Sequence, residues 1–557
     1  MQLEKFDWLT DDSRTFLDRG YIEGITAEER YMQIAKRVGE ISQINGIAEK
    51  VYEYSKRNLL SFSSPILSNF GNNKGLPISC NFGVVDDTLH SILHGMYEMG
   101  ILAKNGAGTA KNLSAIRPYG LKYGKDKSGI SEGLISWLTE YSNIIAKVSQ
   151  GGMRRGFLTA YCTVEHPEID WFLDVGANGD VKKSPGYGIQ NITTGVTIPK
   201  GWIDAMRAGD KDKRKTYAKI LKRRSEIGFP YILFEDNCDD QKPQVYVDKD
   251  MRIFTSNICT EVIEYCDSEK EFTCCLMSLN AAKFDEWPDD LVFVANIILD
   301  CVISEYIAKG SEMQGLEKAV KFATEHRAIG VGILGFHDYL QKKMIPFGSL
   351  ESYQTNAKIF KKLRDESDYA SRWMAEQWGE PEMLKGYGLR NTTRIAIAPT
   401  KSSSFIMGQL SLSVEPIKSN YHEKTLAKIQ TTYKNPQLIP ILEKHGQNTR
   451  EVWKSILENN GSVQHLEFLS DLEKDVFKTF SEVSQVDVIK LAAQRQKFID
   501  QGQSINIMIH PDTPPKDVSN LVLLAHDEGI KTLYYQYSIN AAQKFNENLM
   551  VCSACEA

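Results

Sequence analysis

Residues 80–96, CNFGVVDDTLHSILHGM, predict a strand followed by a helix. The run from Cys80 to Val85 is typical of a short buried strand, and Asp87 is placed to cap the helix that follows. Short apolar strands alternate with amphipathic helices in this way from about residue 76 onward, which favours an α/β architecture. The apolar face of the first such helix is expected to carry Leu89, Ile92, Leu93 and Met96.

Three regions are expected along the 557 residues of the chain. Residues 1–72 should form a helical domain, because apolar residues recur there at spacings of three and four. Residues 73–540 should form the α/β body, with a helical insertion at about 423–500, and the polar residues 541–557 a mobile tail. The helical spacing is carried by Tyr31, Ile34, Ala35, Val38 and Ile41 in the first region and by Phe468, Leu472, Val476 and Phe480 in the insertion.

The composition is that of an ordinary globular protein. Apolar residues make up 42% and charged residues 25% of the chain, and the formal charge is −6. This small charge offers no basic surface, so neither nucleic acid nor a membrane is expected as a partner. The first residues lack a secretory signal, so we expect a cytoplasmic protein. The apolar run from Leu291 to Ile303 contains Asn296 and Asp300 and predicts a buried core helix.

A thiol stands between an amide and a carboxylate in residues 255–262, TSNICTEV. In extended backbone Asn257, Cys259 and Glu261 project to the same side. The amide can then hydrogen-bond a substrate and the carboxylate can act as a general base, a set suited to reaction with a hydroxyl. An edge strand with its polar residues facing solvent explains the same pattern.

Cys552 and Cys555 form a C-x-x-C motif in the terminal segment. Such a pair forms a readily exchanged disulfide, which favours delivery of electrons to a second cysteine pair in the folded body. A zinc site would need two more ligands, and neither a second C-x-x-C nor an H-x-x-x-H motif accompanies the pair. No metal site is therefore expected.

Two further segments carry groups suited to chemistry. Tyr534 and Tyr535 lie in a predicted last strand, Lys531 to Tyr537; they are typical strand formers, and their phenols are also redox-active. Residues 398–404, APTKSSS, follow a predicted strand and place hydroxyls and backbone N–H groups at a helix start, where they would cradle a phosphate. An ordinary helix cap explains this segment equally well.

Together these motifs resemble the large, catalytic subunit of class I ribonucleotide reductase. Residues 257–261 match the family's Asn-x-Cys-x-Glu motif, residues 533–536 its radical-relay motif, and the terminal cysteines its reducing tail. The resemblance covers nearly the whole chain in the family's order. It also includes Ser63-Ser64-Pro65, Ser79-Cys80, residues 150–154, residues 273–280 and residues 398–404.

The resemblance implies a ten-stranded α/β barrel around a loop that carries Cys259. This residue would become a thiyl radical and abstract the 3′-hydrogen of a ribonucleotide, Glu261 would take the 3′-hydroxyl proton, and Asn257 would hydrogen-bond the substrate. Cys80 and Cys274 would supply the electrons that remove the 2′-hydroxyl, and the tail pair would then reduce their disulfide. The resemblance assigns substrate binding to Ser64, Ser79, Pro399, Thr400, Lys401, Ser402, Ser403, Ser404 and Arg154.

The resemblance also implies partners. A separate, metal-containing small subunit would supply the radical, which Tyr534 and Tyr535 would relay to Cys259, so that this chain binds no cofactor of its own. Thioredoxin or glutaredoxin would recharge the tail. The expected assembly is a homodimer that reduces ribonucleotides, expected to be diphosphates, to deoxyribonucleotides for DNA synthesis.

Regulation is expected at the family's specificity site. Its positions for an ATP or dNTP effector fall on Asp87, Arg117 and Gln150, and the loop that follows would read the substrate base through Arg154. The helical layer begins almost at Met1, which leaves no room for the family's N-terminal ATP cone. Lys401 also departs from the family, because relatives commonly carry a neutral or acidic residue there.

Three other functions are compatible with parts of this pattern. An adenosylcobalamin-dependent, class II reductase would need no tyrosine relay. A catalytically silent regulatory relative would keep the fold and lose the reactive residues, all of which are present here. A general thiol-disulfide oxidoreductase would be a much smaller chain with its C-x-x-C near the start.

Overall fold

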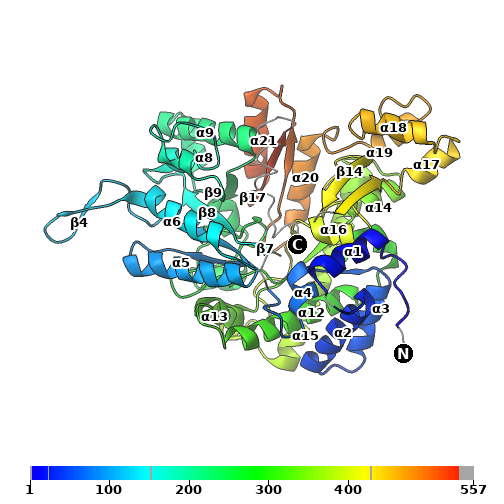
Figure 1. Ribbon diagram of the computed structural model, residues 1–557, viewed down its shortest axis with the longest axis horizontal. Coiled ribbons are helices and arrows are strands. Elements are labelled where there is room, and N and C mark those ends of the chain that lie inside the picture. Colours follow the sequence, from blue (N-terminus) through cyan, green and yellow to red (C-terminus); the bar gives the residue numbers. More distant parts are fainter. Residues whose placement is uncertain (1–2, 23, 79, 151–153, 427–428, 539–557) are drawn as a thin grey trace.

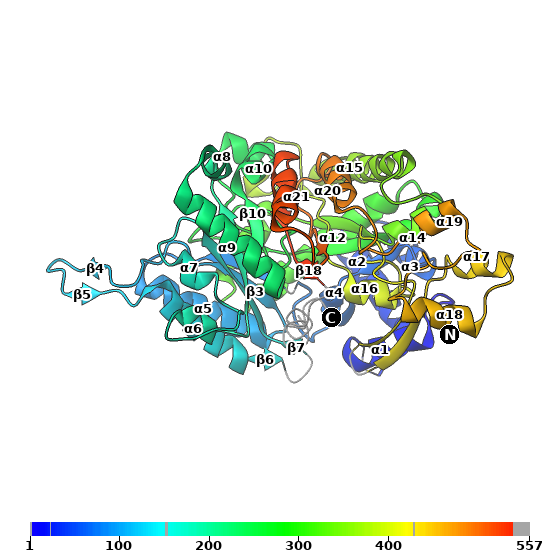
Figure 2. The same ribbon diagram turned by 90° about the horizontal axis from the view of Figure 1, so that it is seen from above.

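The computed structural model describes residues 3–22, 24–78, 80–150, 154–426 and 429–538. An N-terminal layer of helices lies against a body built on two β-sheets (Figure 1). Seen from above, this layer and the helices of the larger sheet lie at opposite ends of the molecule (Figure 2). The expected α/β architecture is confirmed.

The N-terminal layer consists of α1 (Asp11–Gly20), α2 (Ala27–Ser42) and α3 (Ile47–Lys56). Helix α2 begins at a capping box, in which Thr26 and Glu29 each bond the backbone N–H of the other. The predicted face of α2 is confirmed, because Tyr31, Ile34, Ala35 and Val38 are buried and Ile41 is partly buried. This face packs against α3 and the core helix α12 (Leu291–Gly310).

The larger sheet has seven strands, and its five central strands are parallel. Antiparallel strands close both of its edges. In spatial order the strands are β11 (Phe272–Thr273), β2 (Cys80–Val84), β3 (Gly108–Asn112), β8 (Phe157–Thr163), β9 (Thr193–Ile198), β10 (Tyr231–Phe234) and β17 (Thr532–Leu533).

Strand β8 explains how the two faces of this sheet differ. Successive side chains of a strand point to opposite faces. Leu158 and Ala160 pack in the cluster formed with α5 (Leu89–Lys104), α6 (Gly133–Lys147) and α9 (Lys211–Ile227). Phe157 and Tyr161 point the other way, into the cluster that contains Cys259. The outer face is therefore covered by helices, and the inner face looks onto the site.

The smaller sheet has three strands, in the order β1 (Leu60–Phe62), β12 (Leu276–Asn280) and β13 (Gly330–Leu334). Two parallel bridges, Val331 to Ile395 and Ile397 to Gln503, continue it toward the end of the chain. Its outer side packs on α12 and α15 (Leu350–Trp378).

Helix α12 is the core helix predicted from its apolar sequence, and it extends to Gly310. Among the described residues it is the one helix long and apolar enough to cross a membrane, yet 78% of its most apolar window is buried inside the protein. Asp300, which interrupts the apolar run, is buried and paired with Arg327 at 2.8 Å. The helix therefore belongs to the core.

The segment 251–263 is held between the two sheets. From the larger sheet, Asn112 Nδ2 donates to the carbonyl of Phe254 at 3.3 Å and Tyr161 Oη donates to the carbonyl of Asn257 at 2.7 Å. From the other side, the backbone N–H of Gly502 donates to the carbonyl of Glu261 at 2.8 Å. The sheets thus curl around this segment, as expected for the α/β barrel.

Helix α5 forms where predicted, but its cap and its buried face differ from the prediction. Thr88, not Asp87, is the N-cap and accepts a hydrogen bond from Ser91 N. Leu89 and Leu93 are 62% and 49% exposed, whereas the core side of the helix carries Ile92, Met96, Met99 and Leu102. The predicted face mixed two sides of the helix, because apolar residues occur on both.

The region at about 423–500 contains more than the predicted helices. The region begins with a β-hairpin. Helix α19 is only six residues long and ends before Phe477, and Leu472 on this helix is 52% exposed. The predicted single face from residue 468 to 480 was therefore wrong. The elements are β14 (Tyr421–Leu426), β15 (Ile429–Lys434), α17 (Ile439–Lys444), α18 (Arg450–Glu458), α19 (Asp471–Val476) and α20 (Gln485–Gln496).

The predicted last strand is divided in two. Strand β17 ends at Leu533, and β18 (Gln536–Ser538) pairs with β16 (Ile507–Ile509) in a separate small sheet. The backbone between them, at Tyr534 and Tyr535, belongs to neither strand. The predicted mobile tail, residues 541–557, lies outside the described residues.

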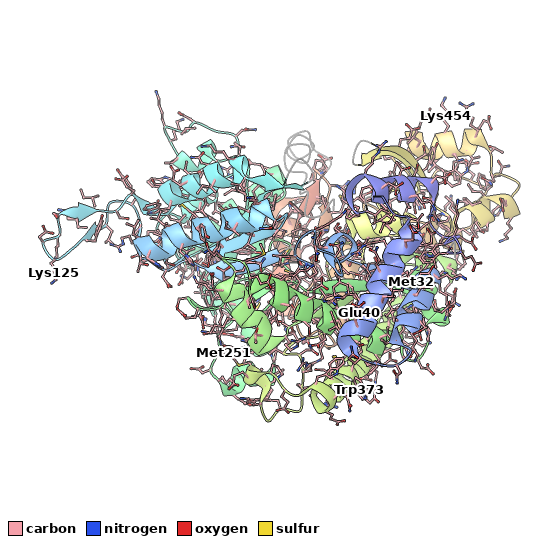
Figure 3. All side chains as sticks on the ribbon, turned by 60° about the horizontal axis from the view of Figure 1, so that its bottom comes forward. Met32, Glu40, Lys125, Met251, Trp373 and Lys454 are labelled. Carbon is pink, nitrogen blue, oxygen red and sulfur yellow. The ribbon has the colours of Figure 1, made fainter. Side chains whose placement is uncertain are left out.

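A hairpin projects from the body beside α6. It consists of β4 (Lys122–Tyr123) and β5 (Gly129–Ile130), and Lys125 lies at its tip (Figure 3). The other elements include α4 (Ser64–Asn69), α7 (Ile169–Phe172), α8 (Trp202–Ala208), α10 (Glu235–Asp240), α11 (Gln244–Asp248), α13 (Glu317–His326), α14 (Phe336–Lys342), α16 (Lys401–Ile406) and α21 (Pro515–Asp527).

Candidate active site

The thiol of Cys259 lies on a tight turn and not on the extended strand that its sequence pattern predicts. Ile258, Cys259 and Thr260 form the turn, and Thr260 adopts a left-handed backbone with φ of 70°. Asn257 Oδ1 closes the turn by accepting the backbone N–H of Val262 at 3.1 Å. Cys259 is 7% exposed, so the turn presents the thiol in a nearly dry interior.

The structure brings Cys80 and Cys274 side by side. Strands β2 and β11 are antiparallel, and the backbone N–H of Cys274 donates to the carbonyl of Cys80 at 3.0 Å. Burial raises the pKa of the Cys274 thiol well above its usual value, and the neighbouring Cys80 thiol raises it further. The raised pKa favours the protonated thiol of Cys274.

Asn257 joins the turn to this cysteine pair. Its Nδ2 donates to Sγ of Cys274 at 3.3 Å, within reach of a hydrogen bond to sulfur. Cys275, next in sequence, points away, and its Sγ lies 3.4 Å from the carbonyl of Leu299 in α12. Of the two adjacent cysteines, only Cys274 faces the predicted site.

Glu261 is 2% exposed and lies beside Ser504. The Ser504 hydroxyl is 3.0 Å from Oε2 of Glu261 and 2.5 Å from the carbonyl oxygen of Cys259. Among the described residues, Asn257, Cys259, Glu261 and Cys274 thus share one buried neighbourhood.

Tyr534 and Tyr535 make ring contact where the backbone leaves the sheet. Their centroids are 4.4 Å apart with an interplanar angle of 61°, which is an edge-to-face contact. Tyr534 is 3% exposed and packs in the same cluster as Cys259, whereas Tyr535 is only partly buried. The two rings therefore lead outward from the thiol.

A third ring, Tyr231 in β10, contacts both of these tyrosines. Its centroid lies 4.6 Å from that of Tyr534 and 5.1 Å from that of Tyr535. Burial raises the pKa of Tyr231 well above its usual value, and Tyr535 adds to the effect. Tyr537 stacks on the other side of Tyr535 at 6.0 Å and 20°.

The predicted phosphate-binding segment forms the start of the short helix α16. Thr400 Oγ1 accepts the backbone N–H of Ser413 at 2.7 Å and lies 2.9 Å from Ser404 Oγ, so it does not cap the helix with its side chain. Ser402 and Ser404 are buried, Pro399 and Ser403 are partly buried, and Lys401 is exposed.

Ser64 begins α4, which packs on the N-terminal layer, and helix α1 of this layer packs on α16. Its Oγ donates to Tyr21 Oη at 3.3 Å, and Tyr21 contacts Phe16, which in turn packs against Phe405 of α16. The N-terminal helices therefore bring residue 64 and α16 into one packed unit. Ser79 lies outside the described residues.

The predicted specificity residues Asp87 and Arg117 pair with each other. Arg117 Nε is 2.7 Å from Asp87 Oδ2, and the guanidinium lies 4.6 Å from the ring centroid of Tyr123 in the projecting hairpin. The pair is about one-third exposed, at 29% and 35% for the Arg117 and Asp87 side chains. Gln150 and Arg154 face each other in the hairpin of β6 (Ser149–Gln150) and β7 (Arg154–Arg155), but their side chains lie outside the described set.

The family model "Ribonucleotide reductase, barrel domain" matches residues 78–213, 204–383 and 375–536. The chain belongs to the ribonucleotide reductase family. It is 32% identical to the ribonucleoside-diphosphate reductase large subunit of Invertebrate iridescent virus 3, over 91% of this chain and 90% of that protein. The large subunit of Danio rerio is 25% identical over 93% of this chain and 74% of its own length.

A solved structure of this family is also similar. The Actinobacillus ureae class Id ribonucleotide reductase alpha subunit is 46% identical and superposes with a TM-score of 0.89, covering 99% of this chain and 100% of that one. This reductase chain therefore shares the fold of a class I alpha subunit over the part that the structure describes. Residues 11–56 contain helices α1 to α3.

Sequence reasoning missed the segment 502–507, which links the parts of the reductase site. Gly502 N bonds Glu261, Tyr534 N donates to the carbonyl of Ile505 at 2.8 Å, and Tyr535 N donates to Oδ1 of Asn506 at 3.1 Å. The loop of residues 251–263 and the tyrosine pair are thus bonded to the same stretch of backbone. The available signal was a run of buried polar residues, Gln501, Gln503, Ser504 and Asn506, in an otherwise apolar strand pattern.

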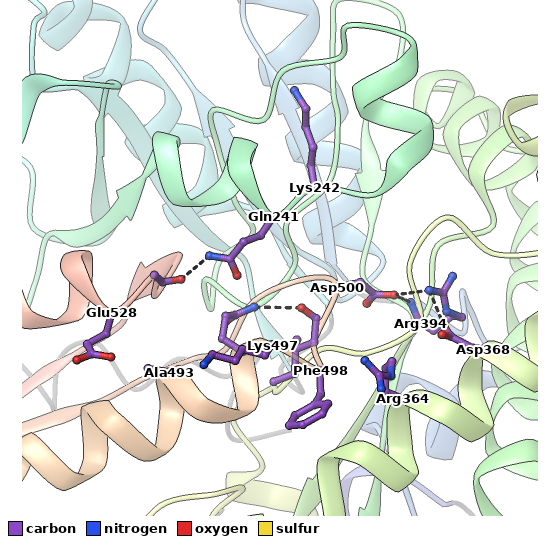
Figure 4. A pocket seen from close by; sticks show the side chains of 13 residues that line it. Gln241, Lys242, Arg364, Asp368, Arg394, Ala493, Lys497, Phe498, Asp500 and Glu528 are labelled. Carbon is purple, nitrogen blue, oxygen red and sulfur yellow. Dashed lines mark hydrogen bonds and ion pairs between the residues drawn. The ribbon is translucent and has the colours of Figure 1, made fainter. Parts of the chain in front are cut away.

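A surface cavity of about 490 Å³ lies behind this segment and contains none of the predicted site residues (Figure 4). Three of its charged groups, Asp368, Arg394 and Asp500, pair with one another. Arg394 contacts Asp368 at 2.9 Å and Asp500 at 3.3 Å, and Asp500 accepts the backbone N–H groups of residues 394 and 395. These bonds anchor the strand that leads to α16, so the cavity marks a structural joint of the reductase.

The described part of the chain contains no group of three or more His, Cys, Asp or Glu residues placed to hold a metal ion.

Proposed function

We propose that this chain is the catalytic large subunit of a class I ribonucleotide reductase and that it reduces ribonucleoside diphosphates to 2′-deoxyribonucleotides for DNA synthesis. The observation that carries the proposal is the bond from Asn257 to Cys274, which joins the turn of Cys259 to the pair of Cys80 and Cys274. One buried site thereby combines a hydrogen-abstracting thiol, a base and a two-electron reductant.

Each residue of the site has a defined task in this reaction. The thiyl radical of Cys259 takes the 3′-hydrogen of the ribose, and Glu261 takes the 3′-hydroxyl proton, which lets the 2′-hydroxyl leave as water after protonation. Cys80 and Cys274 provide the two electrons and are oxidised to a disulfide. The hydrogen then returns from Cys259 to the 3′-carbon, so each turnover consumes one dithiol and regenerates the radical.

The state of Cys274 suits this task. A group with a raised pKa remains protonated at neutral pH, and a protonated thiol can give its hydrogen to the leaving hydroxyl. Asn257 orients Sγ of Cys274 through its amide and closes the radical turn through its carbonyl oxygen. The same side chain therefore sets the position of both sulfur atoms.

Radical entry requires a partner in this proposal. Tyr534 and Tyr535 carry the oxidising equivalent from a small subunit whose metal generates it, and this chain supplies no metal of its own. Support comes from the ring contact between the two tyrosines and from the shared cluster of Tyr534 and Cys259. Thioredoxin or glutaredoxin reduces the tail cysteines 552 and 555 between turnovers.

In this proposal, substrate and effector bind at separate sites. The substrate phosphates are bound by Ser64, Ser79 and residues 399–404, and the substrate base is contacted by Arg154. ATP or a dNTP binds at the specificity site of Asp87 and Arg117, close to Gln150. Tyr123 lies under the guanidinium and gives that site an apolar wall.

The assembly proposed is a cytoplasmic homodimer. The exposed side of α5 carries Leu89, Leu93 and Tyr97, which are 62%, 49% and 44% exposed. Apolar side chains at helical spacing on an exposed face mark a surface that another protein covers. The specificity site at Asp87 lies at the start of this same helix, so dimerisation and effector binding would influence each other.

The test is a reconstitution assay. The chain is mixed with its small subunit, thioredoxin, thioredoxin reductase and NADPH, and the formation of dCDP from CDP is measured; CTP replaces CDP in a parallel reaction. We expect turnover with the diphosphate that depends on the small subunit. Turnover with adenosylcobalamin in place of the small subunit would assign the chain to class II instead.

A further inference from the structure

The hydroxyl of Ser504 lies between two acceptors of the site. Its oxygen is 2.5 Å from the carbonyl oxygen of Cys259 and 3.0 Å from Oε2 of Glu261, and the residue is 7% exposed. A serine hydroxyl carries one proton and two acceptor lone pairs. It can therefore donate fully to only one of these two oxygens at a time.

The protonation state of Glu261 decides which of the two receives that proton. An ionised carboxylate only accepts hydrogen bonds, so the hydroxyl then points to Oε2 of Glu261. When the carboxyl is protonated on its other oxygen, Oε2 becomes an uncharged C=O and a weaker acceptor than the carboxylate. The serine proton then turns to the carbonyl of Cys259, and no heavy atom has to move.

Ser504 is held firmly in this position. Its backbone N–H donates to the carbonyl of Ile397 at 2.9 Å, and the N–H of Ile397 donates to the carbonyl of Gly502 at 3.1 Å. A Cβ at position 502 would lie 2.8 Å from Ile263 Cγ1 and 3.2 Å from the carbonyl of Glu261. Glycine is needed there because the segment approaches the radical loop so closely.

Asn257 is not available for the same task in the described structure. Its Oδ1 accepts from Val262 N and its Nδ2 donates to Cys274 Sγ, so both ends of the amide are engaged. The Thr532 hydroxyl is bonded to the carbonyl of Thr260 in the loop and to that of Gln503 in the neighbouring segment. Among the described residues, Ser504 is a side chain whose hydroxyl reaches both the carboxylate and the turn of Cys259.

We propose that Ser504 is a positioning residue for Glu261 that serves both protonation states of the base. Before hydrogen abstraction it donates to the carboxylate and directs the other oxygen toward the 3′-hydroxyl. After Glu261 has taken the 3′-hydroxyl proton on that other oxygen, Oε2 is an uncharged and weaker acceptor, and the Ser504 hydroxyl turns to donate to the carbonyl of Cys259. Ser504 neither gains nor loses a proton, and only its O–H bond rotates. This inference rests on the proposed function.

The inference is tested by measuring the titration midpoint of Glu261 itself. The antisymmetric stretch of the Glu261 carboxylate is followed by infrared difference spectroscopy against pH in the full chain, and the Glu261→Gln variant identifies the band. A hydrogen bond to the charged form favours that form, so its loss raises the pKa. We expect Ser504→Ala to move the midpoint upward by about one pH unit, the scale of one charge-assisted hydrogen bond.

Two variants serve as controls. Ser504→Thr keeps the hydroxyl and should leave the midpoint where it is in the unaltered chain. Ser256→Ala removes a buried hydroxyl of the same loop that donates to the carbonyl of Val262 at 2.9 Å, and it should not move the midpoint. Ser504→Cys keeps the size of the side chain with a weaker donor, so it should give an intermediate shift if Ser504→Ala fails to fold.

The reconstituted holoenzyme gives a second reading. The acid limb of kcat/KM for CDP should move to higher pH in Ser504→Ala and remain in place in Ser256→Ala, and Ser504→Ala should add no further loss in the Glu261→Gln background. An unchanged infrared midpoint in Ser504→Ala and Ser504→Cys would overturn the role of Ser504. An inactive unaltered holoenzyme would instead overturn the proposed function, because the infrared titration needs no turnover.

Discussion

The amide nitrogen of Asn257 donates to the sulfur of Cys274 across 3.3 Å. Asn257 lies on the loop of residues 251–263, whereas Cys274 directly follows strand β11. The same amide closes the turn that carries Cys259. A change in the turn that carries Cys259 therefore also changes the position of Cys274. This coupling predicts that the cysteines of the site are not interchangeable with the other buried cysteines of the chain.

Replacing Cys259 with serine should abolish turnover. A serine hydroxyl cannot form the radical under these conditions, and the side chain makes no essential contact with the substrate in the ground state, so we expect a loss of at least about 10³-fold in kcat with little change in CDP binding. Cys266→Ala is the control, because Cys266 is equally buried and lies in the same cluster. Appreciable dCDP formation by the Cys259→Ser protein would refute the assignment.

Replacing each cysteine of the 274–275 pair separately distinguishes their roles. Cys274→Ala should prevent catalytic cycling, because it removes one of the two reducing thiols. Cys275→Ala should retain turnover and lose about 1 kcal/mol of stability, because its thiol faces α12. The measurements are dCDP formation and thermal unfolding. Equal loss of activity in both variants would contradict the choice of Cys274.

Changing the terminal cysteines 552 and 555 to serine should separate the first turnover from the later ones. The chain is first reduced and freed of excess reductant, so the Cys80 and Cys274 pair should support one dCDP per site without the tail. Cycling with thioredoxin should stop, and dithiothreitol should restore part of it by direct reduction. Rapid-quench counting of product per site, with and without thioredoxin, measures both effects. Full thioredoxin-driven cycling without these cysteines would assign the motif another purpose.

Tyr534→Phe and Tyr535→Phe should each block turnover without unfolding the chain. Phenylalanine fills nearly the same space, but it cannot be oxidised at biological potentials. Tyr537→Phe is the matched control, because Tyr537 stacks on Tyr535 at 6.0 Å and phenylalanine preserves that stack. Turnover is measured with the small subunit, and folding by circular dichroism. Activity in the Tyr534→Phe or Tyr535→Phe protein would favour a radical made within the chain, as in class II.

The sequence predicted the chemistry of the site better than its geometry. The motif of Asn257, Cys259 and Glu261 supplied the proposed reactive residues, which the structure places in one buried neighbourhood. Their common side was inferred from extended backbone, and the chain instead turns at Thr260 with φ of 70°. A left-handed non-glycine residue leaves no clear mark in a sequence, because its cost is offset by contacts made elsewhere. The bond from Gly502 to Glu261 is one such contact.

Ser504 illustrates why the remainder of the site escaped sequence reasoning. It lies 243 positions from Glu261 along the chain, and no spacing rule connects residues so far apart. The predicted burial of Leu89 and Leu93 was wrong for another reason. Periodicity identifies an apolar face of a helix but not which part of the protein covers it. Their exposure in one chain is compatible with burial against a second copy.

The last prediction concerns dATP. In the 557-residue chain the first helices belong to the layer that packs on α16 and α12, so the specificity site is the one nucleotide-effector site that we propose. A ligand shifts an equilibrium only through its differential affinity for two states. We therefore expect dATP to change which base is reduced and not to stop the enzyme, as measured by titrating CDP reduction with dATP into the millimolar range.

Asp87→Ala and Arg117→Ala test whether this preference arises at the paired residues. The pair is about one-third exposed, and such surface pairs contribute little to stability, so the variants should fold normally. Each should flatten the choice among bases at saturating dATP while leaving CDP reduction without effector intact. Lys213→Ala, which removes an exposed pair with Glu165 at 3.6 Å, serves as a control away from the site. Near-complete inhibition by dATP, accompanied by a larger complex in light scattering, would instead place activity control at another site or on the small subunit.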